Sequence, residues 1–271
     1  MCRLAALAGP TLPLSTALFD APHSLYEQAI RPREQLKGRV NVDGTGIAWW
    51  RPGEEQPLRY RTDGAPWADE NLVSLAPRLA APLQLAAVRS ATPGMPYSVG
   101  NAAPFIWGPL AMAHNGWIGE FRTATMAPLL QRLPADVFAA FDAVSDSLVL
   151  FLTLVAAWRD DPSAGLAGAA RRTVATVAEV CRTAGAAAAL TFAVGDGVQV
   201  VAVRTGIDTP ANTMYSLTGG QRFAGANLLA SEALDDDEGW TAVPPESLVR
   251  LSAAGVSAEP LHAPDERTTV S

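Results

Sequence analysis

Cys2 stands directly after the initiator methionine, and Cys181 is the only other cysteine among the 271 residues. A cysteine in an apolar stretch such as MCRLAALAGP is usually a small hydrophobic side chain of the core. Its position, however, allows methionine aminopeptidase to remove Met1, because cysteine is small. Cys2 would then carry an α-amine with a reference pKa of about 7.7–8.0 beside a thiol with one of about 8.5. Because the amine can take the thiol proton near neutral pH, the position predicts an N-terminal nucleophile.

A nucleophile that attacks a carbonyl needs donors for the oxyanion, and the stretch AHNGWIG contains two candidates. Asn115 offers a side-chain amide, and Gly116 lets its backbone N–H approach a ligand closely. The same dipeptide is also typical of an ordinary turn between two strands, which is its commonest meaning. No histidine is required as the base, and the chain has three: His23, His114 and His262.

Two charged residues could hold the ends of an amino-acid substrate. Arg89 follows the apolar run LQLAAV, and a guanidinium there can clamp a carboxylate through two parallel hydrogen bonds. Asp146, in VSDSLVL, lies at the start of an apolar segment that we predict as a helix. Its carboxylate could pair with an ammonium group, although capping the helix is the commoner role of an aspartate there.

Metal and cofactor chemistry have no support in the sequence. The cysteines and histidines do not show the paired spacing of a zinc site. Neither a GxGxxG stretch nor a phosphate-binding loop occurs along the chain. We therefore expect no metal and no organic cofactor.

The composition limits the partners of this protein. The formal net charge is −7 and no cluster of lysine and arginine stands out, which argues against nucleic acid and membranes as partners. The apolar run SLVLFLTLVAAW, residues 147–158, is shorter than the roughly 20 residues that cross a bilayer, so it predicts a buried helix. Two cysteines do not form a disulfide framework, and we expect a cytoplasmic protein.

The order of the predicted elements indicates one α+β domain with layered sheets and helices. The apolar pattern predicts strands, then two adjacent helices, then strands again. We assign residues 1–258 to this domain and 259–271 to a flexible tail. Strands are predicted at 2–9, 39–50 (a hairpin that turns at Asp43-Gly44), 83–92, 109–119, 187–206 (a second hairpin) and 227–234, and helices at 145–161 and 164–185.

Taken together and in this order, the motifs resemble the class II glutamine amidotransferases, a branch of the N-terminal nucleophile hydrolases. The matching stretches are MCRLAALAG, VNVDGTGIAWW, VRSATPGMP, NAAPF, MAHNGWIGEF and SDS, from residue 1 to about residue 147. The resemblance implies a four-layer αββα sandwich of two antiparallel sheets. It also implies roles: Cys2 as the nucleophile, Asn115 and Gly116 as the oxyanion hole, Arg89 on the α-carboxylate of a glutamyl group, Asp146 on its α-amine, and Thr92 and His114 as further substrate-binding residues.

A narrower resemblance concerns the amidohydrolases of ergothioneine biosynthesis, which remove glutamate from γ-glutamyl-hercynylcysteine sulfoxide. MCRLAALAGP, AAVRSATPGMP, PFIWGPLAMAHNG and LLASEALDDDEGW carry it, and the last stretch extends it to about residue 251. It implies hydrolysis of a small-molecule γ-glutamyl substrate. Two alternatives stay open: a glutaminase subunit that delivers ammonia from glutamine to a separate synthase, and a protein that kept the fold without the chemistry.

Some positions depart from the family pattern or carry no assigned role. Leu148 stands where many members have an acidic residue after SDS, and Ala87 stands where many have a histidine. Both affect the finer shape of the glutamyl pocket. No oligomeric state follows from the sequence. An aromatic wall for a quaternary ammonium on the leaving group could come from residues near the motifs: Trp49, Trp50, Trp67, Tyr97, Phe105, Trp107 and Trp117.

Overall fold

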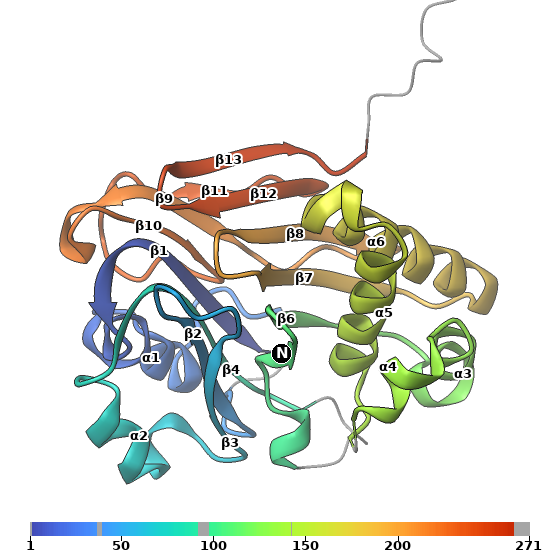
Figure 1. The fold of residues 1–271 in the computed structure, drawn as a ribbon, viewed down its shortest axis with the longest axis horizontal. Helices are drawn as coiled ribbons and strands as arrows, with labels where there is room; N and C mark the ends of the chain where they lie inside the picture. The colour runs from blue at the N-terminus through green and yellow to red at the C-terminus, as the bar shows by residue number, and fades with distance from the viewer. Residues whose placement is uncertain (1, 37–39, 92–97, 142, 263–271) are drawn as a thin grey trace, which may run out of the picture.

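The computed structural model describes residues 2–36, 40–91, 98–141 and 143–262, so Thr92 and Tyr97 lie outside the described residues. Two antiparallel sheets form the middle of the molecule (Figure 1). The first sheet has the strand order β11-β9-β10-β1-β4-β2-β3, and the second has the order β13-β12-β8-β7-β6-β5. The strands are β1 (Arg3–Pro13), β2 (Thr45–Trp50), β3 (Leu58–Thr62), β4 (Ala80–Val88), β5 (Phe105–Trp107), β6 (Leu110–Ile118), β7 (Ala188–Gly195), β8 (Val200–Ile207), β9 (Tyr215–Gly220), β10 (Ala226–Ala230), β11 (Thr241–Ala242), β12 (Ser247–Ser252) and β13 (Gly255–Pro260).

Helices cover the outer face of each sheet. α1 (Leu25–Ile30) and a short π-helical segment, Thr16–Asp20, pack on the first sheet. α5 (Asp146–Asp160) and α6 (Gly165–Ala184) pack on the second sheet (Figure 1). This stacking confirms the predicted four-layer αββα sandwich. The other short helices are α2 (Glu70–Leu75), α3 (Met126–Leu130) and α4 (Ala135–Ala139).

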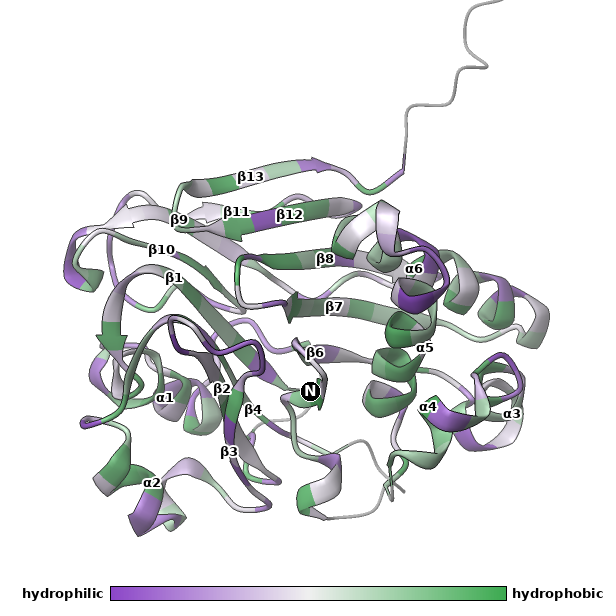
Figure 2. Ribbon diagram, in the orientation of Figure 1, coloured by the Kyte–Doolittle hydropathy of each residue, from purple (hydrophilic) through white to green (hydrophobic). Residues whose placement is uncertain are grey.

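The apolar core is divided into layers that match this stacking. Along β1, Leu4 and Ala6 face the second sheet, whereas Ala5 and Leu7 face the α1 layer. β7 is buried along its whole length, and it is drawn largely in the colours of apolar residues in Figure 2. A strand with both faces covered reads as a continuous apolar run rather than as an alternating one. The central strands are therefore held by packing on both sides.

The two long helices begin and end at local signals in the sequence. Ser145 Oγ accepts a hydrogen bond from the Leu148 amide N–H at 3.2 Å and so caps the start of α5. Gly185, with φ +61°, ends α6 in a left-handed conformation that favours glycine. The helices predicted at 145–161 and 164–185 are confirmed, and so is the hairpin at 187–206, which is formed by β7 and β8.

One local prediction is wrong, and one alternative reading of a dipeptide is excluded. Asp43-Gly44 does not turn a hairpin, because β2 begins at Thr45 and pairs with β3 and β4 rather than with residues 40–43. Asn115-Gly116 does not form a turn either, since both residues lie inside β6 and face Thr191 and Leu190 of β7. In both places pairing with a distant strand overrides the local preference of the dipeptide.

The ends of the predicted strands and of the domain also differ in detail. β10 ends at Ala230, so the predicted strand at 227–234 stops before Ser231. Glu259 and Pro260, assigned from the sequence to the tail, belong to β13 and pair with β12. Leu261 is buried. The described part of the sandwich thus extends a few residues past position 258.

The described helices and titratable side chains bear on membrane and metal binding. In the part of the chain that the structure describes, none of the helices has both the length and the apolar character needed to span a bilayer. Over the same ranges, His, Cys, Asp and Glu side chains do not gather in any group of three or more that could hold a metal ion.

Candidate active site

The start of β1 brings Cys2 beside the end of β4. The register pairs Arg3 with Val88, and because the strands are antiparallel, the next opposed positions are Cys2 and Arg89. Alternation along the strands directs both side chains to the face that looks toward the second sheet, where Ala87 also lies. Cys2 and Arg89 line one small pocket together with Ala87, Asn101, Ala103, Phe105, His114 and Ser147.

Arg89 is buried and is tied to the segment before β2. Its amide N–H donates to the Gly44 carbonyl at 2.7 Å, and its carbonyl accepts from the Asp43 amide N–H at 2.9 Å. Its Nη1 donates to the Asp43 carbonyl at 3.3 Å. The Asp43 carboxylate in turn accepts from the Ala91 amide N–H at 2.8 Å. Asp43-Gly44 therefore braces the guanidinium beside the pocket instead of forming a turn.

Gly116 presents its backbone N–H at an open edge of β6. β5 pairs with β6 only as far as Met112, and among the described residues no other strand continues along that edge. The Ile118 N–H points out from this edge and donates to Asp146 Oδ2 at 3.2 Å. Since N–H directions alternate along a strand, the Gly116 N–H points to the same side. Ser147, which lines the pocket, follows Asp146 on that side.

His114 packs directly over Gly116. A Cβ atom at position 116 would overlap His114 Nε2 and the Ala189 carbonyl oxygen, so this position requires glycine. His114 Nε2 donates to the Ala189 carbonyl at 3.1 Å, and Nδ1 accepts from Ser147 Oγ at 2.9 Å. Burial lowers the pKa of His114, although the charge of Asp146 opposes the shift. The ring is therefore neutral, and with both nitrogens engaged it forms a fixed part of the pocket wall.

The Asn115 side chain reaches toward the start of β1. Its Nδ2 donates to Ser231 Oγ at 3.2 Å, and the same oxygen accepts from the Leu4 amide N–H at 3.0 Å. Its main-chain carbonyl accepts from Asn212 Nδ2 at 2.8 Å. An amide NH₂ group carries two protons, so the contact with Ser231 leaves a second donor on Asn115. Ser231 thus holds the side chain beside the start of β1, and the contacts among the described residues leave the second donor unused.

Asp146 joins α5 to β6 and is 3% exposed. Its Oδ2 accepts from the Ile118 N–H, and its Oδ1 accepts from the Ser147 N–H at 2.8 Å. The hydroxyl that caps α5 belongs to Ser145, so capping is not the role of Asp146. Asp146 itself does not line the pocket, whereas its neighbour Ser147 does. The carboxylate thus lies just behind the wall of the pocket.

The two cysteines differ in accessibility. Cys2 is partly exposed, and its Sγ lies 3.9 Å from the Ser90 carbonyl oxygen. Cys181 is fully buried in α6. Burial, with a smaller effect from Asp208, raises the pKa of Cys181 to about 11. Because the thiolate is the reactive form, Cys181 is inert at neutral pH, and Cys2 is the thiol available for chemistry.

The site also contains residues to which the motifs did not point. Ser147 orients His114, and Ser231 links Asn115 to β1. Their signal in the sequence is weak: Ser147 is the second serine of SDS, and Ser231 interrupts the apolar run NLLASEAL. Thr92, predicted to bind substrate, lies outside the described residues.

The pocket has less aromatic surface than the sequence suggested. Phe105 is the one aromatic residue among its described lining residues. Trp50 is buried between the sheets, where its Nε1 donates to the Pro109 carbonyl at 3.0 Å. Trp107 stacks on Phe141 beside α4 and α5. These tryptophans therefore serve the core rather than the described pocket wall.

The αββα sandwich, with a cysteine at the start of a central strand, defines an N-terminal nucleophile hydrolase fold. Among solved structures, the chain is similar to a glutamine aminotransferase class-II domain protein from Silicibacter pomeroyi, with a TM-score of 0.70 and 23% identity over 97% of this chain and 100% of that one. It is also similar to the glutamine phosphoribosylpyrophosphate amidotransferase of B. subtilis, with a TM-score of 0.61 and 15% identity over 97% of this chain and 50% of that one.

Sequence relatives place the chain within this class. No family model matches it. It is 32% identical over 260 residues to the gamma-glutamyl-hercynylcysteine sulfoxide hydrolase of Mycobacterium tuberculosis, and the aligned residues cover 95% of each chain. The hydrolase of the same name from Mycolicibacterium smegmatis is 32% identical over 96% of this chain and 100% of its own. A probable glutamine amidotransferase of Saccharomyces cerevisiae is 27% identical over 96% of this chain and 84% of its own. The chain belongs to the class II glutamine amidotransferase family.

Proposed function

We propose that this protein is an amidohydrolase that cleaves a γ-glutamyl amide through a thioester on Cys2. The observation that supports the proposal is that Cys2 and Arg89, the next residues beyond the Arg3–Val88 pair of β1 and β4, line one pocket. A glutamyl group has three carbons between its α-carboxylate and its γ-carbonyl carbon. Its α-carboxylate can therefore lie at the guanidinium while its γ-carbonyl carbon lies at the thiol, because both groups line the same pocket.

The reaction uses the main chain and side chains around Cys2. Once Met1 is removed, the α-amine of Cys2 takes the thiol proton as Sγ attacks the γ-carbonyl carbon. Asn115 Nδ2 and the Gly116 N–H donate to the oxyanion. The C–N bond then breaks, and the α-ammonium gives its proton to the leaving amine. Water, deprotonated by the same α-amine, attacks the thioester; the C–S bond breaks, the thiolate is protonated again, and glutamate leaves.

The finer proposal is that the substrate is γ-glutamyl-hercynylcysteine sulfoxide, an intermediate of ergothioneine biosynthesis. The products would be glutamate and hercynylcysteine sulfoxide. Support comes from the two mycobacterial relatives that carry this substrate in their names and match this chain over 95–96% of its length. In this role the protein acts in the cytoplasm on a small molecule, without a synthase partner.

A second candidate is a glutaminase subunit that passes ammonia from glutamine to a separate synthase. Two observations favour it: the similarity to a probable glutamine amidotransferase of yeast, and the fold shared with an amidotransferase of which this chain spans half the length. Both candidates share the Cys2 thioester. They differ in which amine leaves and in where it goes.

The test is the release of glutamate, measured by liquid chromatography, from γ-glutamyl-hercynylcysteine sulfoxide, γ-glutamylcysteine and glutamine. We expect kcat/KM for the first substrate to exceed that for glutamine by about 100-fold or more, because binding of the larger leaving group contributes to the transition state. A Cys2→Ala protein measures the background. A preference for glutamine, or co-purification with a synthase whose activity depends on this chain, would favour the ammonia-donor function instead.

A further inference from the structure

Arg3 is a charged residue in an otherwise apolar strand, and its side chain is 0% exposed. It points to the same side of β1 as Ala5 and Leu7, toward the α1 layer, and away from the side on which Leu4 lies. Burial of a guanidinium is unfavourable unless the charge is paired. An apolar side chain would pack in this layer without that penalty. The arginine therefore makes a contact that an apolar residue cannot make.

Glu232, two residues after the end of β10, anchors the guanidinium. Its Oε1 lies 3.1 Å from Arg3 Nε and accepts from the Glu34 amide N–H at 3.1 Å. Its Oε2 lies 2.7 Å from His23 Nε2 and accepts from the Arg33 amide N–H at 2.9 Å. Three of these contacts are hydrogen bonds, and the one with Arg3 is an ion pair. Glu232 is 1% exposed, and four surrounding groups leave it little freedom to move.

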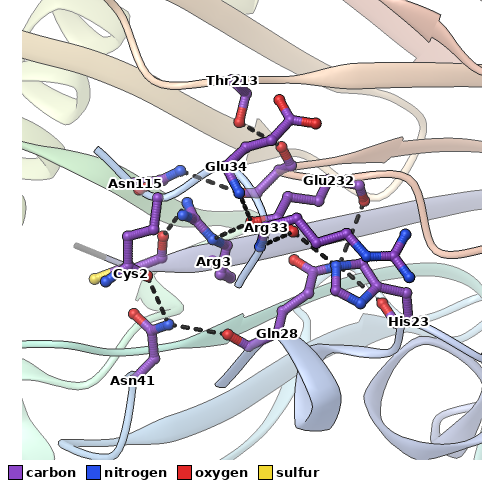
Figure 3. A network of polar contacts seen from close by, with 12 residues as sticks. Cys2, Arg3, His23, Gln28, Arg33, Glu34, Asn41, Asn115, Thr213 and Glu232 are labelled. Atoms are coloured by element: carbon purple, nitrogen blue, oxygen red, sulfur yellow. Dashed lines mark hydrogen bonds and ion pairs between the residues drawn. The ribbon is translucent and has the colours of Figure 1, made fainter. Parts of the chain in front are cut away.

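The other end of the guanidinium contacts the candidate nucleophile residue itself. Arg3 Nη1 donates to the Cys2 carbonyl oxygen at 3.1 Å, and Figure 3 shows the guanidinium between Cys2 and Glu232. β1 and its ladder begin at Arg3 and do not include Cys2. This hydrogen bond therefore holds the Cys2 carbonyl at a position where the ladder does not.

The groups around Arg3 and Glu232 keep the Glu232 carboxylate ionised. The charged and titratable groups that face Arg3 are Glu232 after β10, Glu34 after α1 and Cys2 itself, and His23 ahead of α1 contacts Glu232. Burial raises the pKa of Glu232, but the hydrogen bonds from His23 and from backbone N–H groups, together with the charge of Arg3, outweigh it and leave the pKa below its ordinary value. Glu232 is therefore a carboxylate at neutral pH. A buried ion pair of this kind is weak evidence for a role in stability.

On the basis of the function proposed above, we propose that Arg3 is a positioning residue: anchored on Glu232, it fixes the Cys2 carbonyl and thereby aims the Cys2 thiol and α-amine at the pocket. Arg3 makes no contact with substrate in this role. Its loss lowers kcat more than it raises KM, because Arg89 still binds the glutamyl group while the nucleophile loses its orientation.

The test compares two variants with a matched control. Arg3→Met/Glu232→Gln removes both charges at once, so that no unpaired charge is left in the core. Arg3→Lys keeps the charge, but a compact ammonium cannot span both the Cys2 carbonyl and Glu232 as the guanidinium fork does. The control, Arg171→Met/Glu259→Gln, removes an ion pair between α6 and β13 at the surface.

Two reactions are followed for each protein, and the melting temperature is measured as well. The first is kcat and KM for γ-glutamyl-hercynylcysteine sulfoxide. The second is the rate at which iodoacetamide alkylates Cys2 at several pH values, followed by mass spectrometry. For the double variant we expect kcat to fall about 10–100-fold with KM changed less than about threefold. Cys2 alkylation near neutral pH should slow by about 10-fold, and the control should match the wild type.

A folded double variant with wild-type kcat and wild-type alkylation would overturn the proposal, and so would a change confined to KM and melting temperature. If the double variant does not fold, Arg3→Lys decides: a lowered kcat supports the role, and full kcat contradicts it. Alkylation requires no γ-glutamyl substrate. Slower alkylation of the variant thus supports the role of Arg3 even if the wild type releases no glutamate from any amide, which would refute the proposed function alone.

Discussion

Cys2 and Arg89 are the next residues beyond the Arg3–Val88 pair at which the ladder between β1 and β4 begins, and they line one pocket. The register of two central strands therefore sets the relation between the candidate nucleophile and the candidate carboxylate clamp. A slip of one residue would turn one of the two side chains toward the α1 layer, away from the pocket. The packing of Leu4 and Ala87 between the sheets prevents that slip.

Arg89→Lys tests the clamp. Lysine keeps the charge but loses the planar fork that makes two parallel hydrogen bonds to a carboxylate. Loss of one charge-assisted hydrogen bond corresponds to about 1.5–3 kcal/mol, so we expect kcat/KM for the γ-glutamyl substrate to fall about 10–100-fold, mainly through KM. Steady-state kinetics measure this, with Arg78→Lys on the exposed surface as the control. An unchanged KM in Arg89→Lys would show that Arg89 does not bind the carboxylate of the substrate.

Gly116→Ala tests the close approach of β6, β7 and His114. The new Cβ would overlap His114 Nε2 and the Ala189 carbonyl oxygen, both of which are fixed. We expect a loss of about 3 kcal/mol in the free energy of unfolding, measured with urea. Gly64→Ala is the matched control, because its Cβ would meet nothing nearer than Thr62 Oγ1 at 3.8 Å. If both variants are equally stable, the packing at position 116 is looser than described.

Asp146→Asn and Ser145→Ala separate substrate binding from helix capping. Ser145 caps α5, so Ser145→Ala should lower stability by about 1 kcal/mol and leave kcat/KM nearly unchanged. Asp146→Asn removes the charge proposed to bind the α-ammonium of the glutamyl group, and it should lower kcat/KM about 10–100-fold. Kinetics and thermal unfolding of the two proteins decide. A stability loss in Asp146→Asn with wild-type kcat/KM would make this residue purely structural.

The pH dependence of stability tests the burial of His114. Its pKa is lowered by burial, so the folded protein resists the proton that the unfolded chain takes up below about pH 6.5. The stability due to the neutral ring is therefore complete above that pH and is lost as the pH falls toward the folded-state pKa. One such group contributes a slope of up to about 1.4 kcal/mol per pH unit.

Urea unfolding of the wild type and His114→Gln between about pH 7.5 and 5 measures this slope. The wild type should lose stability more steeply than the variant over that range. His262→Gln, at an exposed position, is the control and should follow the wild type. Parallel slopes for wild type and His114→Gln would show that His114 titrates normally in the folded protein.

Local signals account for the parts of the fold that the sequence predicts well. The helices α5 and α6 have long apolar or alanine-rich runs with a cap at the start or a glycine at the end, and β7–β8 is a hairpin with a short turn. The dipeptides Asp43-Gly44 and Asn115-Gly116 are typical of turns, but neither forms one, because contacts with distant segments determine their conformation. Arg89 forms a hydrogen bond with Asp43, and β7 pairs with Asn115 and Gly116.

The site could be predicted where a family motif names the residue, and not where a contact joins distant segments. Cys2, Arg89 and His114 come together in one pocket, whereas their catalytic and binding roles stay predictions. The pair of Arg3 and Glu232 joins β1 to the segment after β10, and only a charged residue in each of two apolar stretches of sequence hints at it. Such a hint shows that a partner is needed without naming the partner.

Labelling with 6-diazo-5-oxo-norleucine, a glutamine-like electrophile, tests the central claim most directly. The Cys2 thiol of the processed protein should form one covalent adduct, on a peptide that begins at Cys2 and lacks Met1, and glutamate release should fall in proportion to the adduct. Cys181 should stay unlabelled, because burial raises its pKa to about 11. An adduct on Cys181, an active protein that retains Met1, or glutamate release that survives complete labelling of Cys2 would contradict the account.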